Sequence, residues 1–183
     1  IPIVADAKLA IEALLEYIEP HDLGDWPAQL QQLKEERPVT QAGEEGLTPQ
    51  NIIDYINNHY DRPVVTTDVG QNQLWTTQFL EIEGNHQLLT SGGLGTMGYG
   101  FPAAIGAQFG NPTKRVFAIC GDGGVQMNIQ EFATAMHYHL PVTLVVINNG
   151  YLGNVRQWQQ LFYDKRYACT NLLMDESAIV TRD

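Results

Sequence analysis

Residues 116–124 read Val-Phe-Ala-Ile-Cys-Gly-Asp-Gly-Gly, and residues 142–149 read Val-Thr-Leu-Val-Val-Ile-Asn-Asn. The apolar part of each run has the length and β-branched content of a buried strand in a parallel sheet. A helical segment is expected between them, from about Asn128. We therefore predict a β-α-β unit, the building block of an α/β domain with a parallel sheet and helices on both faces.

Oxygen-bearing side chains follow both predicted strands. Ligands bind at the carboxyl ends of strands in open parallel sheets, so Asp122 and Asn149 are expected at one edge. Their carboxylate and amide oxygens suit Mg²⁺. The backbone amides of Gly123 and Gly124 can approach a phosphate, which the start of a following helix also favours. The pattern favours a metal-bound diphosphate here, although a Gly-Asp-Gly run alone is also typical of surface turns.

A glycine-rich segment precedes this unit. Residues 63–70 read as a buried parallel strand that ends in glycine. Gln71 and Asn72 follow it, and their amides can either donate hydrogen bonds to phosphate oxygens or form a polar turn. After a short strand over 87–90, residues 91–100 read Ser-Gly-Gly-Leu-Gly-Thr-Met-Gly-Tyr-Gly. Such a glycine density indicates unusual backbone angles or close approach to a flat ligand.

Length, charge and cysteine content limit the class of protein. A chain of 183 residues has the length of a single domain and can bury a sizeable core. The net charge of -11 disfavours binding to nucleic acid or to an anionic membrane surface. The sequence has no run long enough for a transmembrane helix and no signal peptide, so we expect a cytoplasmic protein. Cys120 and Cys169 have no metal-ligand spacing, and Cys120 is expected to be a reduced core residue.

The chain is expected to divide into a lead-in over residues 1–47 and the main domain over residues 48–183. Residues 1–4 read as the end of a strand, and helices are expected over 6–18 and 27–36. The main domain begins with Thr-Pro, which suits the N-cap and the first position of a helix. A chain that begins inside a strand is expected to be a fragment whose last strands are also missing.

The Gly-Asp-Gly run, a spacer of 24 residues and the following Asn-Asn resemble the signature of thiamine-diphosphate-dependent enzymes. Two further runs narrow the resemblance. Residues 91–101 and residues 155–163, Val-Arg-Gln-Trp-Gln-Gln-Leu-Phe-Tyr, closely resemble the acetohydroxyacid synthase (acetolactate synthase) catalytic subunit family. The resemblance covers about residues 63–170. Residues 1–47 resemble, more weakly, the tail of that family's middle domain and its linker.

The resemblance implies a cofactor and its contacts. Thiamine diphosphate would bind with Mg²⁺, whose ligands would be Asp122, Asn149 and the backbone carbonyl of Tyr151. The Gly95 carbonyl and the Met97 amide would orient the aminopyrimidine, and the Met97 side chain would hold the cofactor bent. The implied cofactor-binding residues are Gln71, Asn72, Gly95, Thr96, Met97, Asp122, Gly123, Gly124, Asn149, Tyr151, Leu152 and Gly153.

Asn154 and Trp158 are the residues that the resemblance implies for the substrate pocket. Trp158 would form a wall of the pocket for the second substrate. From the residue pattern alone, Trp158 reads instead as a core position on an amphipathic helix, beside Leu161 and Phe162.

The sequence departs from the family's pattern at three site positions and at its end. Asn72 stands where the family usually has His, and Gly124 stands where Ser is common. Both keep the capacity to bind phosphate, through the amide group or the backbone. Asn154 stands where Met is usual, which bears on substrate preference. Residues 174–183 do not resemble the family's continuation.

The reaction implied for the parent enzyme is decarboxylation of pyruvate and condensation with a second 2-oxo acid, in branched-chain amino-acid biosynthesis. In the family, a glutamate on another domain of a partner subunit activates the cofactor. No counterpart of that domain, nor most of the FAD-binding middle domain, is recognised in this sequence. We therefore assign no catalytic residue here and expect the chain alone to be inactive.

The implied partners are pyruvate, a second 2-oxo acid, further copies in a homodimer or tetramer, and a regulatory small subunit. Nucleic acid and membrane are not expected as partners. Two alternatives stay open. One is another thiamine-diphosphate-dependent 2-oxo acid decarboxylase or oxidase, and the other is a non-catalytic cofactor-binding module.

Overall fold

The computed structural model describes residues 2–40, 46–82 and 87–173. The chain divides into two compact units, residues 1–40 and residues 41–183. The boundary expected from the sequence, between residues 47 and 48, falls inside the second unit. Among the described residues, no helix has both the length and the apolar character needed to cross a bilayer.

The first unit contains α1 (Ala7–Leu15) and α2 (Trp26–Glu36). The Asp6 carboxylate caps α1 by accepting hydrogen bonds from two first-turn amides at 3.0 and 3.2 Å. The expected strand at the start of the chain is wrong, because the described residues 2–4 pair with no other strand. α1 also ends earlier than expected, at Leu15 instead of near Ile18.

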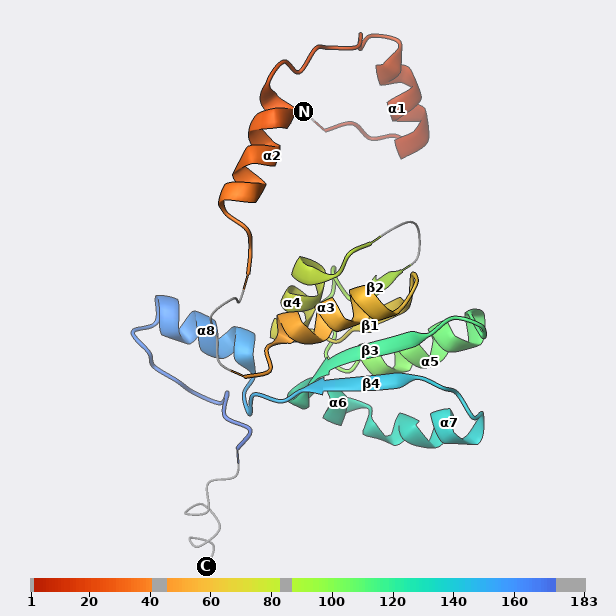
Figure 1. Cartoon of the computed structure of the whole chain (residues 1–183), viewed down its shortest axis with the longest axis vertical. Helices are drawn as coiled ribbons and strands as arrows, with labels where there is room; N and C mark the ends of the chain where they lie inside the picture. Colours follow the sequence, from red (N-terminus) through yellow and green to blue (C-terminus); the bar gives the residue numbers. More distant parts are fainter. Residues whose placement is uncertain (1, 41–45, 83–86, 174–183) are drawn as a thin grey trace, which may run out of the picture. The chain divides into compact units, whose positions relative to one another are not determined.

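The second unit contains a sheet and its covering helices (Figure 1). Its elements are, in chain order, α3 (Pro49–His59), β1 (Val64–Thr67), α4 (Gln71–Phe79), β2 (Leu88–Thr90), α5 (Gly100–Gly110), β3 (Val116–Gly121), α6 (Asp122–Met127), the 3-10 turn η1 (Ile129–Glu131), α7 (Phe132–His137), β4 (Thr143–Ile147) and α8 (Gly153–Phe162).

The four strands form one parallel sheet in the order β2-β1-β3-β4. The crossover between β3 and β4 is the β-α-β unit predicted from the sequence. In the register of the sheet, Thr67 pairs with Ile119 and Gly121 pairs with Ile147. The carboxyl ends of β1, β3 and β4 therefore meet at one edge, which brings the segments that follow them close together.

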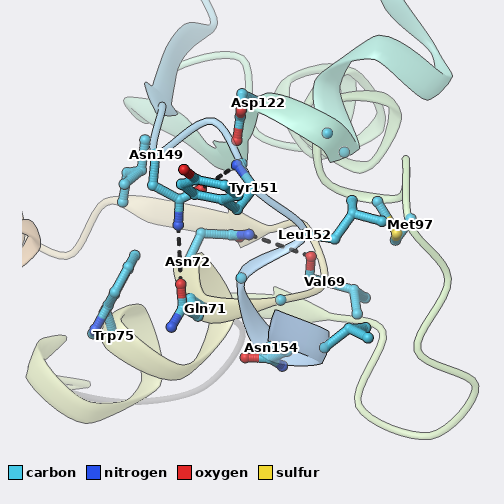
Figure 2. A pocket seen from close by; sticks show the side chains of 17 residues that line it. Val69, Gln71, Asn72, Trp75, Met97, Asp122, Asn149, Tyr151, Leu152 and Asn154 are labelled. Atoms are coloured by element: carbon cyan, nitrogen blue, oxygen red, sulfur yellow. Dashed lines mark hydrogen bonds between the residues drawn. The ribbon is translucent and has the colours of Figure 1, made fainter. Parts of the chain in front are cut away.

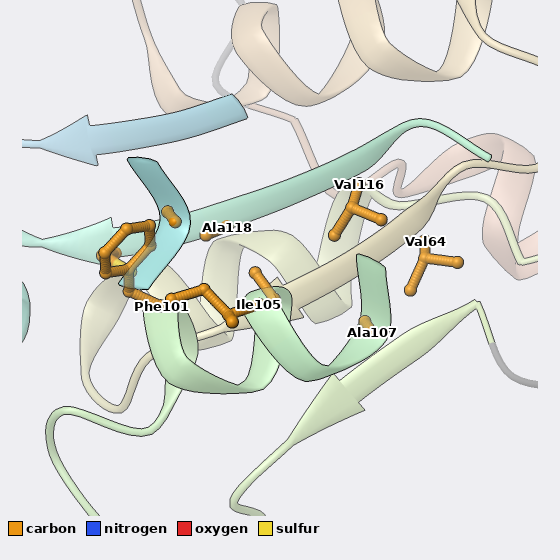
Figure 3. Packing of buried hydrophobic residues seen from close by; sticks show 9 residues of the cluster. Val64, Phe101, Ile105, Ala107, Val116 and Ala118 are labelled. Atoms are coloured by element: carbon orange, nitrogen blue, oxygen red, sulfur yellow. The ribbon is translucent and has the colours of Figure 1, made fainter. Parts of the chain in front are cut away.

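One half of the core lies between the sheet and α5. Val116, Ala118 and Cys120 of β3 point to this face and pack with Phe101 and Ile105 (Figure 3). The alanines and glycines of α5 let the helix approach the strands closely, because small side chains allow a short distance between the two backbones.

The other half of the core lies on the opposite face, under α3. Phe117 and Ile119 of β3 pack there with Ile53 and Ile56, which are both almost completely buried. Each such side chain contributes roughly 1.5–3 kcal/mol relative to an exposed one. The predicted cap of α3 is present, since Thr48 exchanges side-chain and backbone hydrogen bonds with Asn51. The predicted α/β fold with helices on both faces is confirmed.

Two predicted boundaries near the sheet edge are wrong. The helix after β3 begins at Asp122, immediately after the strand, and not near Asn128. Two glycines in its first turn lower helix propensity and masked it in the sequence. The first strand ends at Thr67, because the backbone bends at residues 69 and 70, where Gly70 has a φ of +127°. The first shift shortens the loop after β3, and the second lengthens the loop after β1.

Candidate functional site

Three helices begin at the carboxyl edge of the sheet. α4 starts at Gln71 after β1, α6 starts at Asp122 after β3, and α8 starts at Gly153 after β4. In the described part of the chain, none of the three has a side-chain hydrogen bond at its N-cap. Free first-turn N–H groups carry partial positive charge, so their convergence favours a bound anion.

A pocket lies among these helix starts (Figure 2). Its lining comes from all three strand-to-helix loops and from the glycine-rich segment before α5. The lining residues are Val69, Gly70, Gln71, Asn72, Trp75, Met97, Gly121, Asp122, Gly123, Gly124, Ile147, Asn149, Tyr151, Leu152, Gly153, Asn154 and Val155.

Asp122 and the turn after β4 are joined by hydrogen bonds. The Asp122 carboxylate accepts from the Gly150 amide at 3.1 Å, and the Asn149 side-chain oxygen accepts from the Tyr151 amide at 3.0 Å. Asp122 is the one acid among the described lining residues. No group of three or more His, Cys, Asp or Glu side chains that could hold a metal occurs in the described ranges. A cation here would need amide or carbonyl oxygens beside the carboxylate.

Gln71 and Asn72 form the opposite wall. The Gln71 side-chain oxygen accepts from the Asn149 side-chain nitrogen at 2.9 Å, which ties the start of α4 to the turn after β4 (Figure 2). Asn72 is only 4% exposed, and its side-chain nitrogen donates to the Val69 carbonyl at 3.3 Å. Its side-chain oxygen has no hydrogen-bond partner within the described chain. A buried acceptor without a partner is costly, and a ligand that donates a hydrogen bond would satisfy it.

Apolar side chains pack closely against Gly123 on the floor of the pocket. A Cβ built on Gly123 would lie 3.0 Å from the Leu152 side chain and 3.5 Å from the terminal methyl of Met97. The Met97 side chain therefore reaches across to the Gly-Asp-Gly-Gly loop. Because a side chain at position 123 would crowd Leu152, the glycine allows these apolar groups to lie against the loop beside the polar end of the pocket.

Eleven of the fourteen predicted site residues line this one pocket. They come from four separate segments of the sequence, which the sheet brings together. They are Gln71, Asn72, Met97, Asp122, Gly123, Gly124, Asn149, Tyr151, Leu152, Gly153 and Asn154. Like Asn72, Asn154 has a buried side-chain oxygen with no partner among the described residues.

The other three predicted site residues do not line this pocket. Gly95 and Thr96 are exposed on the segment that leads to Met97, and Gly95 has a φ of +64°. Trp158 is 63% exposed on α8 and lines a separate hollow with Tyr163 and Tyr167. The core position considered for Trp158 from the residue pattern is therefore wrong for the described chain.

Asp68 is a buried residue at the edge of this site to which the sequence assigned no role. It is completely buried and accepts backbone hydrogen bonds from Gly98 and Gly100. The sequence contains one sign of this role: an acid stands directly after the buried strand 64–67, and a buried charge requires partners.

Cys120, the predicted reduced core residue, is a free buried thiol nearby. Burial, and then the charge of Asp68, raise the pKa of Cys120 to about 12.

The fold and the pocket place the protein among parallel α/β domains that bind a ligand where the strands end. Residues 68–180 match the family described as "Thiamine pyrophosphate enzyme, C-terminal TPP binding domain", and the chain belongs to this family. The match identifies thiamine diphosphate as the cofactor of the domain. It also extends through most of residues 174–183, which the resemblance in sequence had left out; their structure lies outside the described residues.

The curated relatives identify the branch of the family. The chain is 40% identical to the acetolactate synthase large subunit of Cyanidium caldarium over 93% of its length, and 42% identical to that of Lactococcus lactis over 91%. It is 43% identical to that of Corynebacterium glutamicum over 94%. The chain is thus homologous to acetolactate synthase large subunits, and it spans only 29–30% of the length of these relatives.

Proposed function

We propose that the pocket holds the diphosphate of thiamine diphosphate together with Mg²⁺. The observation that carries the proposal is the convergence of three uncapped helix starts, within the described chain, on a pocket with one carboxylate. The helix starts favour a polyanion. Asp122, the Asn149 side-chain oxygen and the Tyr151 carbonyl supply hard oxygen ligands for the cation that a diphosphate needs.

The residues at the pocket fit the rest of the cofactor as well. The unpartnered oxygen of Asn72 suits a donor group, and Met97 adds an apolar side chain to the pocket lining against which a flat ring can pack. We infer that Met97 supports the ring end while the Gly95 carbonyl and the Met97 amide orient it. When bound, thiamine diphosphate supplies a carbon nucleophile and an electron sink for decarboxylating 2-oxo acids.

For the longer protein we propose acetolactate synthase activity, with pyruvate and a second 2-oxo acid as substrates. The support is the name shared by the relatives that match more than nine tenths of this chain. It favours this activity over another 2-oxo acid decarboxylase or oxidase and over a non-catalytic module. We further propose a cytoplasmic homodimer or tetramer with FAD in a middle domain, a regulatory small subunit, and an activating glutamate supplied by a partner subunit.

Isothermal titration calorimetry of the chain with thiamine diphosphate, with and without Mg²⁺, tests the site. We expect Mg²⁺ to raise the affinity at least about tenfold, and Asp122→Ala to remove most of this gain. The matched control is Asp61→Ala, which removes one exposed carboxylate on the far side of β1 from the pocket loops. Equal affinity with and without Mg²⁺ would overturn the proposed metal site.

A further inference from the structure

Asp68 is a carboxylate in a position where water cannot reach it. It follows directly on β1, and its side chain is completely buried. Its own amide donates to the Ile119 carbonyl at 2.9 Å, so its backbone continues the ladder between β1 and β3. A buried carboxylate requires strong hydrogen bonds from its surroundings to offset the loss of hydration.

Backbone amides of the glycine-rich segment provide these hydrogen bonds. The Gly98 amide lies 3.0 Å from each carboxylate oxygen of Asp68, and the Gly100 amide donates to one of them at 3.1 Å. The Val69 amide donates at 2.8 Å. Hydrogen bonds to a charged acceptor are the strong ones, so Asp68 fastens the Met97–Gly98 and Tyr99–Gly100 peptides to the end of β1.

The segment that Asp68 fastens is the one that carries Met97. Gly98 has a φ of +89°, and its carbonyl accepts from the Asn128 side-chain nitrogen at 2.8 Å. A Cβ on Gly98 would lie 2.7 Å from both Met127 and Asn128, so no side chain fits there. Gly98, the residue after Met97, is thus held by Asp68 at its amide nitrogen and by Asn128 at its carbonyl.

Asp68 also touches the other half of the pocket. A Cβ built on Gly124 would collide with the Asp68 carboxylate, so this carboxylate packs directly against the first turn of α6. The first turn of α6 belongs to the Gly-Asp-Gly-Gly loop, with Asp122 at its start. One buried side chain therefore contacts both the loop before α5, which carries Met97, and the loop assigned to the diphosphate.

We propose that Asp68 is a positioning residue, which sets the distance between Met97 and the Gly-Asp-Gly-Gly loop and so matches the pocket to a ligand with both a ring end and a diphosphate end. This inference rests on the proposed function for the identity of the ligand. An asparagine of the same shape cannot replace the carboxylate. It has one acceptor oxygen, and its NH₂ group would face the N–H of Gly98 or Gly100.

The test compares Asp68→Asn with the unaltered chain by two measurements. In hydrogen exchange followed by NMR, the Gly98 and Gly100 amides should exchange at least about tenfold faster in the variant, while amides in the β3–β4 ladder keep their rates. In calorimetry with Mg²⁺, affinity for thiamine diphosphate should fall about tenfold or more, while affinity for inorganic pyrophosphate stays within about twofold. The matched control is Asp61→Asn, an exposed acid next to Arg62.

The outcomes separate positioning from general destabilisation. A purely structural role lowers both affinities in parallel, and this result, or unchanged exchange at Gly98 and Gly100, overturns the inference. If Asp68→Asn does not fold, Asn128→Ala replaces it, because this variant removes the hydrogen bond to the Gly98 carbonyl. It should lower the affinity for thiamine diphosphate selectively, by a smaller factor. Unchanged exchange of the Gly98 amide in this variant overturns the inference as well. Failure of the unaltered chain to bind thiamine diphosphate counts against the proposed function, whereas the exchange measurement requires no ligand.

Discussion

The substitutions Gly100→Ala and Gly106→Ala add the same methyl group to the same helix in opposite surroundings. A Cβ on Gly100 would lie 2.6 Å from the Asp68 backbone nitrogen, 2.9 Å from the Cys120 sulfur and 3.0 Å from the Thr67 carbonyl carbon. A Cβ on Gly106 would have no atom within 4 Å among the described residues. The first substitution forces α5 away from the sheet, whereas the second changes only helix propensity.

The expected sizes follow from these contacts. Overpacking against backbone costs roughly 1–3 kcal/mol. Moving the start of α5 also weakens two buried hydrogen bonds, from the Thr66 hydroxyl to the Gly100 carbonyl at 2.7 Å and from the Gly100 amide to Asp68 at 3.1 Å. Their disturbance adds about 1–3 kcal/mol. We therefore expect Gly100→Ala to lower the free energy of unfolding by about 2–6 kcal/mol, and Gly106→Ala to raise it by roughly 0.5–1 kcal/mol.

Urea denaturation followed by far-ultraviolet circular dichroism measures both free energies of unfolding under one set of conditions. Gly106→Ala serves as the internal control, because it reports the gain from replacing a helical glycine without a steric cost. A Gly100→Ala variant whose stability lies within about 0.5 kcal/mol of the unaltered chain would refute the close packing of α5 on β1 and β3.

Four further outcomes are expected. Because burial and Asp68 raise the pKa of Cys120 to about 12, iodoacetamide at pH 8 should modify the exposed Cys169 and leave Cys120 unmodified until the chain unfolds; equal modification of both in the native state contradicts this. The unfolded chain loses the thiol proton first, so the stabilisation from neutral Cys120 is complete below about pH 8.5 and declines as pH rises towards about 12. In the longer protein, Trp158→Leu should change the preference between pyruvate and 2-oxobutyrate as acceptor without loss of cofactor affinity, since Trp158 lies outside the pocket lining. If cofactor affinity collapses while acceptor preference stays unchanged, Trp158 holds the cofactor and does not select the acceptor. The purified chain with thiamine diphosphate, Mg²⁺, FAD and pyruvate should form no acetolactate above background, because Asp122 is the one acid among the described lining residues and a missing general acid or base costs roughly 10²–10⁴-fold. Turnover comparable to that of a full-length synthase would place the activating group within these residues.

Most of the site could be predicted because its residues stand where strands end. The apolar runs 116–120 and 142–147 identify two neighbouring strands of a parallel sheet, and the polar residues after them must then share an edge. Asp122 and Asn149 were found in this way, and the structure places both in the pocket lining. Gln71 and Asn72 follow β1 by the same rule and form the opposite wall.

The errors lie where local patterns are weak. Two glycines hide the first turn of α6, so the helix was expected six residues too late, near Asn128 instead of Asp122. The apolar residues at the start of the chain resemble a strand, yet a strand requires a neighbour to pair with, and residues 2–4 have none in the described sheet. Helix and strand boundaries depend on such partners, which a local pattern does not contain.

The sequence by itself determined the α/β class, the parallel strands and the residue types that gather where the strands end. These follow from periodicity and from short-range preferences of the backbone, which act between neighbours in the chain. Only the tertiary structure decided that Trp158 lies outside the main pocket and that Asp68 holds the peptides beside Met97. Asp68 and Gly98 are 30 residues apart in the chain, and their hydrogen bond exists only because α5 packs on β1 and β3. The role of a buried charge depends on which donors the fold places around it, and that is set by packing between distant segments.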